Sequence, residues 1–257
     1  MTPSMTGISS TPRDAAAAIR HRLRLGSGYV DVFEVLRLLG IELYQAPFPQ
    51  DSLEGAHLVR DGVAFIFVNT SRSLTRQRFT AAHELGHHVL EKAGDGSAVY
   101  ESDVTKPGRD PLEQNAFRFA RFFLIDPDGV GVLVGGIRDP MQQVAATASH
   151  YVVSPEAAAV HLADLGIVSI SAKRELSKAL AARELTPSGL LSRYGYRMAW
   201  TPQDPEPELD PRHVGRALGA YRREWMSLAA LSDALGLSEG QAGDLLVEAG
   251  LKLREQE

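Results

Sequence analysis

The chain has 257 residues, of which 44% are hydrophobic and 23% are charged, and its formal net charge is −5 at pH 7. This composition is typical of a globular protein, and the negative charge disfavours broad attachment to nucleic acid or anionic lipid. The absence of cysteine excludes disulfides, thiolate metal ligands and a cysteine nucleophile, so we expect a cytoplasmic protein.

The first part of the chain is predicted to contain a short tail and two helices. Residues 1–12 have neither the basic start nor the apolar core of a signal peptide, so we expect a disordered tail. Asp14 is in a position to cap a helix over residues 15–23. A second helix is predicted over residues 31–39, with Gly40 as its stop. The sequence contains no run of about 18 apolar residues, so we expect no membrane-spanning helix.

A small antiparallel sheet is predicted next. Residues 41–44 alternate between apolar and polar side chains as a strand does. Residues 56–60 and 63–68 are separated by Asp61-Gly62, a dipeptide that suits the positive φ angles of a two-residue turn. We therefore expect a hairpin here.

The helix predicted from about Thr75 to Lys92 contains the segment His83-Glu84-Leu85-Gly86-His87, an H-E-x-x-H motif. Two histidines four residues apart lie on the same face of a helix, so both imidazoles can reach one divalent ion. The intervening Glu84 could contact a water held by that ion without binding the ion itself. Such a pentapeptide occurs by chance in roughly 1 chain in 100 of this length, so the surrounding sequence has to support the interpretation.

A third ligand is expected downstream, because a catalytic zinc takes three protein ligands and the chain has no cysteine. A polar loop is predicted over residues 97–110, followed by a helix over 111–124. Glu113 lies in the first turn of this helix, where a carboxylate more often only complements the helix dipole. With two histidines nearby it is the best third ligand, in competition with four other acids: Glu91, Glu101, Asp103 and Asp110. His88 points about 100° away from His87 and is not expected to be a ligand.

Three features follow one another between Val30 and Ile167: the predicted hairpin, the run Arg76-Gln77-Arg78-Phe79 just before the histidines, and the pattern Glu113-x-x-Ala116-x-x-Phe119-Ala120. In this order they resemble the ImmA/IrrE family of gluzincin-like zinc metallopeptidases. The resemblance implies that His83, His87 and Glu113 hold zinc and that Glu84 is the catalytic base. It also implies that the substrate is a helix-turn-helix transcriptional repressor, whose cleavage releases stress or mobile-element genes. Where the family usually has Asn or Asp, four residues after the third ligand, this chain has Phe117.

Two helix-turn-helix outlines follow, at residues 141–167 and 228–251. A recognition helix presents Arg, Lys, Asn or Gln to the bases and has cations beside it for phosphate. The second helix of the first outline has no Lys or Arg, and that of the second outline offers Gln241 among acidic side chains. We therefore favour helical hairpins that pack on the peptidase or on a partner, and we disfavour direct DNA binding without excluding it. A basic cluster precedes the second outline and is predicted to be a solvated face, with a phosphate or acidic partner as the alternative: Arg212, Arg216, Arg222 and Arg223.

The predicted fold class is α+β and mostly helical, with a zincin-like metallopeptidase core, a small antiparallel sheet and helix-turn-helix-like segments after it. Five regions are predicted: a tail at 1–12, a peptidase domain at 13–135, a helical extension at 136–200, a proline-rich linker at 201–211 and a C-terminal helical module at 212–257.

The predicted function is that of a zinc-dependent endopeptidase with a protein substrate and no membrane partner. Manganese would tolerate the same nitrogen and oxygen ligands. The oxyanion of the reaction could be stabilised by Tyr100, His88 or Arg118. The alternative is a DNA-binding or repressor-sequestering regulator with an inactive peptidase fold.

Overall fold

The computed structural model describes residues 11–47, 54–91, 98–101, 110–197, 211–223, 226–235 and 239–251. Residues 1–10 of the predicted tail and most of the predicted linker lie outside these residues, whereas Thr11 and Pro12, predicted as the end of the tail, begin the first helix. The fold is mostly helical with one small sheet, which confirms the predicted α+β class. Within the described residues, every helix is too short or too polar to span a lipid bilayer.

The sheet has four strands in the order β1-β3-β2-β4: β1 (Glu42–Ala46), β2 (Gly55–Arg60), β3 (Val63–Asn69) and β4 (Ala98–Glu101). The predicted hairpin is confirmed, since β2 and β3 are antiparallel and Asp61 and Gly62 have φ angles of 51° and 72°. The prediction of a wholly antiparallel sheet is wrong, because β1 pairs with β3 in parallel. Strand β2 lies between β1 and β3 in the sequence and runs opposite to β3. As a result β1 and β3, which are neighbours in the sheet, run in the same direction.

Strand β4 is a second difference from the predicted elements. Residues 97–110 were expected to form a polar loop, but Ala98–Glu101 pairs antiparallel with β2. This short segment includes Val99 and Tyr100, which favour strands, and the exposed edge of β2 offers unpaired backbone groups. The neighbouring residues 102–109 are outside the described part of the chain.

The helices that precede and surround the motif are α1 (Pro12–Arg22), α2 (Val32–Leu38), α3 (Leu74–Leu90), α4 (Pro111–Leu124) and α5 (Pro127–Val134). Helix α1 is capped by Thr11, whose hydroxyl accepts from the Asp14 amide, and not by Asp14 as predicted. Asp14 lies instead in the first turn, where its charge complements the helix dipole. Helix α5 is not predicted by the sequence pattern, because it contains two glycines, but Asp126 caps it through the Gly129 amide.

Seven further helices are described after α5: α6 (Pro140–Tyr151), α7 (Pro155–Asp164), α8 (Ile170–Ala181), α9 (Pro187–Arg193), α10 (Pro211–Arg222), α11 (Leu228–Leu235) and α12 (Glu239–Glu248). One hydrophobic core extends from Ala15 to Leu191, and a second, smaller core joins α10, α11 and α12. Arg216 on α10 is ion-paired with buried Glu42 on β1 at 2.8 Å. The division between residues 13–135 and 136–200 stays a prediction.

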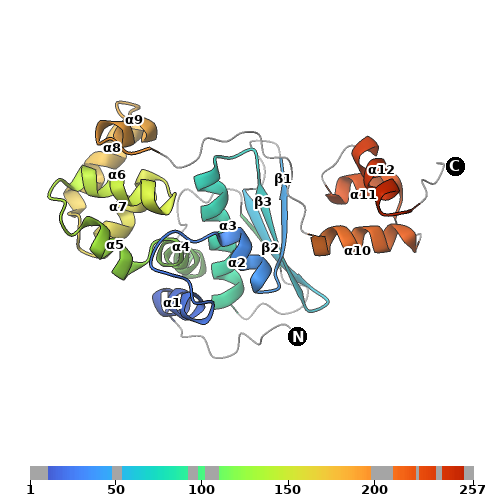
Figure 1. The fold of residues 1–257 in the computed structure, drawn as a ribbon. Coiled ribbons are helices and arrows are strands. Elements are labelled where there is room, and N and C mark those ends of the chain that lie inside the picture. The colour runs from blue at the N-terminus through green and yellow to red at the C-terminus, as the bar shows by residue number, and fades with distance from the viewer. Residues whose placement is uncertain are drawn as a thin grey trace.

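Helix α3 lies in the middle of the larger unit, between the sheet on one side and α4 on the other (Figure 1). Polar side chains fix its position. Arg78 is fully buried and donates to the carbonyls of Val30, Tyr151 and Val152 at 3.0, 3.2 and 3.2 Å. Gln77 donates to the carbonyl of Arg72 at 2.7 Å. Since a buried polar group is costly without a partner, these bonds allow few other placements of the helix.

The buried side chain of His161 on α7 predicts a pH dependence of folding stability. Its ring packs edge-on against Phe122, with centroids 5.1 Å apart, and within the described structure neither ring nitrogen has a hydrogen-bond partner. Burial lowers the pKa of His161 from 6.5 to about 4. The unfolded chain therefore takes up a proton below about pH 6.5 that the folded chain takes up only near pH 4. Stability from this group is complete above pH 6.5 and is lost as the pH falls through that window.

We expect His161→Leu to flatten the stability profile between pH 6.5 and 4, by at most about 1.4 kcal/mol for each pH unit. Urea unfolding at a series of pH values measures this slope. His21→Leu, at an exposed histidine of α1, is the matched control and should keep the wild-type slope. Equal slopes in all three proteins would contradict the prediction.

Candidate metal centre

The two motif histidines are brought together on α3. His83 and His87 are 0% and 1% exposed, and their Nε2 atoms are 3.0 Å apart. The rings are nearly perpendicular, with centroids 4.7 Å apart. The spacing of four residues therefore gives the same-face arrangement that the sequence predicts.

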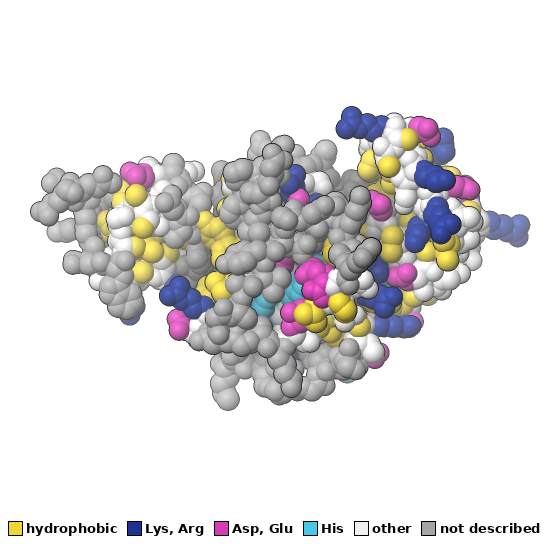
Figure 2. Space-filling model, turned by 180° about the vertical axis from the view of Figure 1, so that it is seen from behind, with side chains coloured by type: hydrophobic (Ala, Val, Ile, Leu, Met, Phe, Trp, Pro, Cys, Tyr) yellow, Lys and Arg dark blue, Asp and Glu magenta, His cyan; other side chains and the backbone are white. Residues whose placement is uncertain are grey.

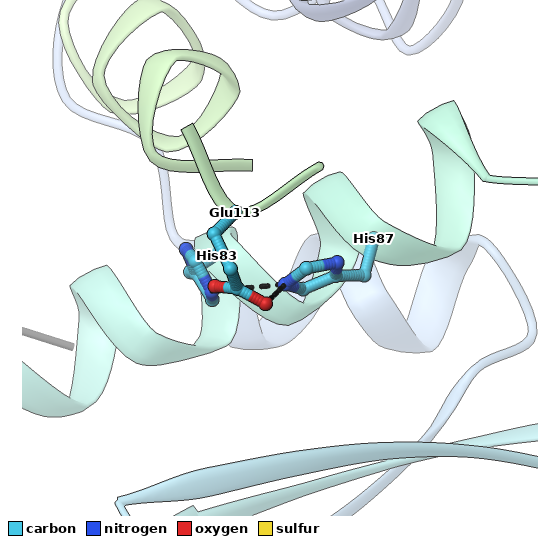
Figure 3. A group of neighbouring side chains, drawn as sticks. All are labelled: His83, His87 and Glu113. Atoms are coloured by element: carbon cyan, nitrogen blue, oxygen red, sulfur yellow. Dashed lines mark hydrogen bonds and ion pairs between the residues drawn. The ribbon is translucent and has the colours of Figure 1, made fainter. Parts of the chain in front are cut away.

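Helix α4 brings Glu113 to the same point (Figure 3). Its carboxylate lies 3.2 Å from His83 Nε2 through one oxygen and 3.2 Å from His87 Nε2 through the other. Asp110 is the N-cap of this helix and accepts from the Leu112 amide, so it orients the first turn and is not part of the cluster. The described residues thus contain one group of three possible ligands: His83, His87 and Glu113.

The close approach of α3 and α4 depends on Gly86. A Cβ atom at this position would lie 3.1 Å from Ala116 Cα and 3.1 Å from the Phe119 ring. Ala116 is one helical turn after Glu113, so the contact that glycine permits also sets how far the carboxylate reaches.

The donor atoms lie close enough together to hold one divalent ion. With metal–ligand distances of 2.0–2.1 Å, the corners of a tetrahedron lie about 3.3 Å apart. The two imidazole nitrogens are 3.0 Å apart, and each lies 3.2 Å from a different oxygen of Glu113. One donor atom from each of the three residues lies within 4.8 Å of the other two. Two imidazoles and one carboxylate leave a fourth corner for water or substrate, which is the pattern of catalytic and not of structural zinc sites.

A second contact orients His87 from its other side. Its Nδ1 atom is paired with Glu91, the C-cap residue of α3. With an ion held between the imidazoles and Glu113, Nδ1 would donate to Glu91 and Nε2 would offer its lone pair to the ion. Glu91 was a competing ligand in the sequence analysis, and the structure gives it this outer position instead. The spacing of four residues on one helix was the signal that could have revealed it.

His83 is oriented by packing. The Phe117 ring meets its imidazole edge-on, with centroids 4.7 Å apart, and Phe117 is almost fully buried. An aromatic ring therefore occupies the place from which a polar side chain could have bonded to this histidine.

Glu84 points from α3 toward the sheet. It is fully buried, and its Oε1 atom would lie 3.1 Å from a Cβ placed on Gly55 of β2. The same Cβ would lie 2.3 Å from Thr80 Cγ2, so glycine is required where the strand crosses the helix. Nothing in the sequence pattern identifies Gly55, because its role depends on how β2 packs on α3.

His88 is half-buried and contacts His57 of β2, with Nδ1 and Nε2 3.0 Å apart. Burial lowers the pKa of both rings, that of His57 to about 4. Of the other predicted oxyanion donors, Arg118 is exposed, and the side chain of Tyr100 lies outside the described residues, as do those of Glu101 and Asp103. On the face shown in Figure 2, histidine side chains are visible beside acidic ones.

Comparison with known proteins supports one assignment. A search of curated proteins finds no match to the sequence. Residues 37–163 match the family model described as the IrrE N-terminal-like domain, a peptidase family. This range contains the sheet, the whole of α3 and α4 and the three clustered side chains. The family is metal-dependent, and its members act on protein substrates. The segment from residue 37 to residue 163 therefore belongs to the ImmA/IrrE family of metallopeptidases.

Proposed function

We propose that this chain is a zinc-dependent endopeptidase that cleaves a peptide bond within another protein. The observation that carries the proposal is the convergence of two imidazole nitrogens, 3.0 Å apart, on one carboxylate, whose two oxygens each lie 3.2 Å from one of them. Glu84 is fully buried on the same helix. The match to a metallopeptidase family supports it.

In this proposal His83, His87 and Glu113 hold the ion. When bound there, zinc would polarise the scissile carbonyl and make the attacking water more acidic. Glu84 takes the proton from that water as the water attacks the carbonyl carbon, and then delivers it to the leaving amine. Glu91 keeps His87 in the tautomer that leaves Nε2 free to bind. Manganese remains an alternative metal because nitrogen and oxygen donors suit it as well.

By family resemblance, the proposed substrate is a helix-turn-helix transcriptional repressor, and its cleavage would release stress or mobile-element genes. A cytoplasmic location follows from this proposal.

The packing of α7 is consistent with a structural role for the first helix-turn-helix outline, because one of its faces is buried in the core: Pro155, Ala158, Ala159, His161 and Leu162.

Metal binding is tested by stripping the protein with a chelator, adding zinc and measuring bound metal by mass spectrometry. We expect one zinc ion for each wild-type chain. His83→Ala and Glu113→Ala should weaken binding by more than about a hundredfold, because loss of an outer contact alone costs 10–100-fold. His150→Ala, at an exposed histidine of α6, is the control and should bind like the wild type. Stoichiometric zinc in the His83→Ala protein would contradict the ligand assignment.

Catalysis is tested with Glu84→Gln, which keeps the shape of the side chain and removes its basicity. We expect this variant to bind zinc normally and to cleave about 10²–10⁴-fold more slowly, the usual contribution of a general base. The assay follows a co-expressed helix-turn-helix repressor by mass spectrometry, and any such protein encoded in a neighbouring reading frame is the first to be tried. Retained cleavage would sink the proposed mechanism. Two other results would favour the regulator alternative. One is an intact repressor in a stoichiometric complex with the wild-type chain. The other is binding of promoter DNA by the metal-free chain in a shift assay.

The contact between Glu91 and His87 predicts a positioning role for Glu91. We expect Glu91→Ala to lower zinc affinity by about 10–100-fold, because the ring loses the acceptor that fixes its tautomer. Glu91→Gln offers a neutral acceptor and should restore part of the affinity. Glu34→Ala, on exposed α2 surface, is the matched control. Competition against a zinc-binding dye measures all four proteins, and equal affinities would remove Glu91 from the site.

A further inference from the structure

A cavity of about 490 Å³ lies beside the metal centre, between α3, α4 and the start of α7. The proposed chemistry does not use it. Its apolar wall consists of Phe79, Phe117, Ala157 and Val160. Two arginines also border it, Arg76 from α3 and Arg121 from α4.

The ring of Phe117 separates this cavity from the metal centre. One side of the ring meets His83, with centroids 4.7 Å apart, and Phe79 packs against it at 5.7 Å. Phe117 lies one helical turn after Glu113, and Phe79 lies one turn before His83. The cavity therefore begins about one ring away from the ligands. Residues of an extended peptide are spaced about 3.3 Å apart. The first or second substrate residue from the cut bond could therefore place its side chain in the cavity.

The two arginines that border the cavity are already compensated, and the remaining charged residue of its lining, Glu156, is exposed. Arg76 is ion-paired with buried Glu54 at 3.2 Å, and Arg121 is ion-paired with Asp164 at 2.8 Å. An anionic group entering the cavity would have to compete with these carboxylates for the same guanidinium groups. An apolar group meets four apolar side chains and displaces no ion pair.

The size of the cavity fits an amino-acid side chain with part of its backbone. Ligand pockets in proteins have volumes of about 300–1,000 Å³, and this cavity is in the lower half of that range. We propose that it is a specificity pocket of the peptidase, which takes a large apolar side chain of the substrate, such as Leu, Met or Phe, within two residues of the cut bond. This inference rests on the proposed function.

Ala157 is a position from which the cavity can be filled. It lies in the first turn of α7, partly buried and in the wall of the cavity. Phenylalanine at this position would occupy the space without removing a charge or an ion pair. Thr75→Tyr narrows the cavity from α3 and does not depend on the packing of α7.

The test uses the zinc-loaded full chain and a peptide library from a proteome digest, with cut sites read by mass spectrometry. For the wild type we expect one position near the cut to be enriched in Leu, Met and Phe. Ala157→Phe and Thr75→Tyr should reduce cleavage of such peptides at least about tenfold relative to peptides with Ala there. Ala181→Phe, on the exposed surface of α8, is the matched control and should keep the wild-type preference. Thermal unfolding shows whether each variant is folded.

A binding measurement separates this inference from the proposed function. Metal-free protein is titrated with N-acetyl-phenylalaninamide and with N-acetyl-alaninamide and observed by saturation-transfer NMR. We expect signal for the first compound only, and loss of that signal in Ala157→Phe. If the wild type cuts peptides without any apolar preference, or folded Ala157→Phe and Thr75→Tyr both keep that preference, the pocket assignment is overturned while the peptidase stands. If the library is not cut at all, the proposed function fails. Independently of cleavage, equal binding of both compounds in the NMR measurement would overturn the assignment of an apolar pocket.

Discussion

The close approach of α3 and α4 at Gly86 is the constraint on which the metal centre depends. A side chain at this position would meet the backbone of Ala116 at 3.1 Å, which is tighter than ordinary van der Waals contact. Because α4 is stiff, a displacement at Ala116 would carry Glu113 away from both imidazoles. Metal sites tolerate deviations of only about 0.2 Å in ligand distance. The small residues at positions 86 and 116 therefore determine the geometry of a site to which neither contributes a ligand atom.

The second requirement is that α3 cannot slide or rotate. Its buried face carries several polar side chains, among them Gln77, Arg78 and Glu84. Apolar packing alone would tolerate small shifts, since it is not directional. The bonds of Arg78 to three carbonyls and of Gln77 to Arg72 are directional, and a shift of the helix would leave buried donors without acceptors. The run from Arg76 to Phe79 is part of the family resemblance. Its hydrogen bonds hold α3 in place about one turn before the candidate ligands.

The sequence predicted those features of the fold that depend on residues close together in the chain. It predicted the α+β class, the hairpin at Asp61-Gly62, the helices that carry the motif and Glu113, and the residues that the structure brings together. It did not predict the parallel pairing of β1, strand β4 or the partner of His57, because each depends on which segments meet in space. Glu91 is an intermediate case: its position four residues after His87 is visible in the sequence, but it was considered only as a competitor of Glu113 for the third-ligand position. The roles of His83, His87, Glu113 and Glu84 in binding and catalysis stay predictions.

The two histidines of the motif are held by different forces, and this difference links the metal centre to the cavity beside it. His87 is fixed by the charge of Glu91, which also makes its Nε2 a stronger donor. His83 is fixed by the shape of Phe117, whose ring also forms part of the cavity wall. Phe79 packs against that ring, and an apolar side chain in the cavity would pack against it as well. A substrate with the right side chain would then steady a ligand of the metal as it binds, so part of its binding energy would act on the reacting centre and not only on affinity.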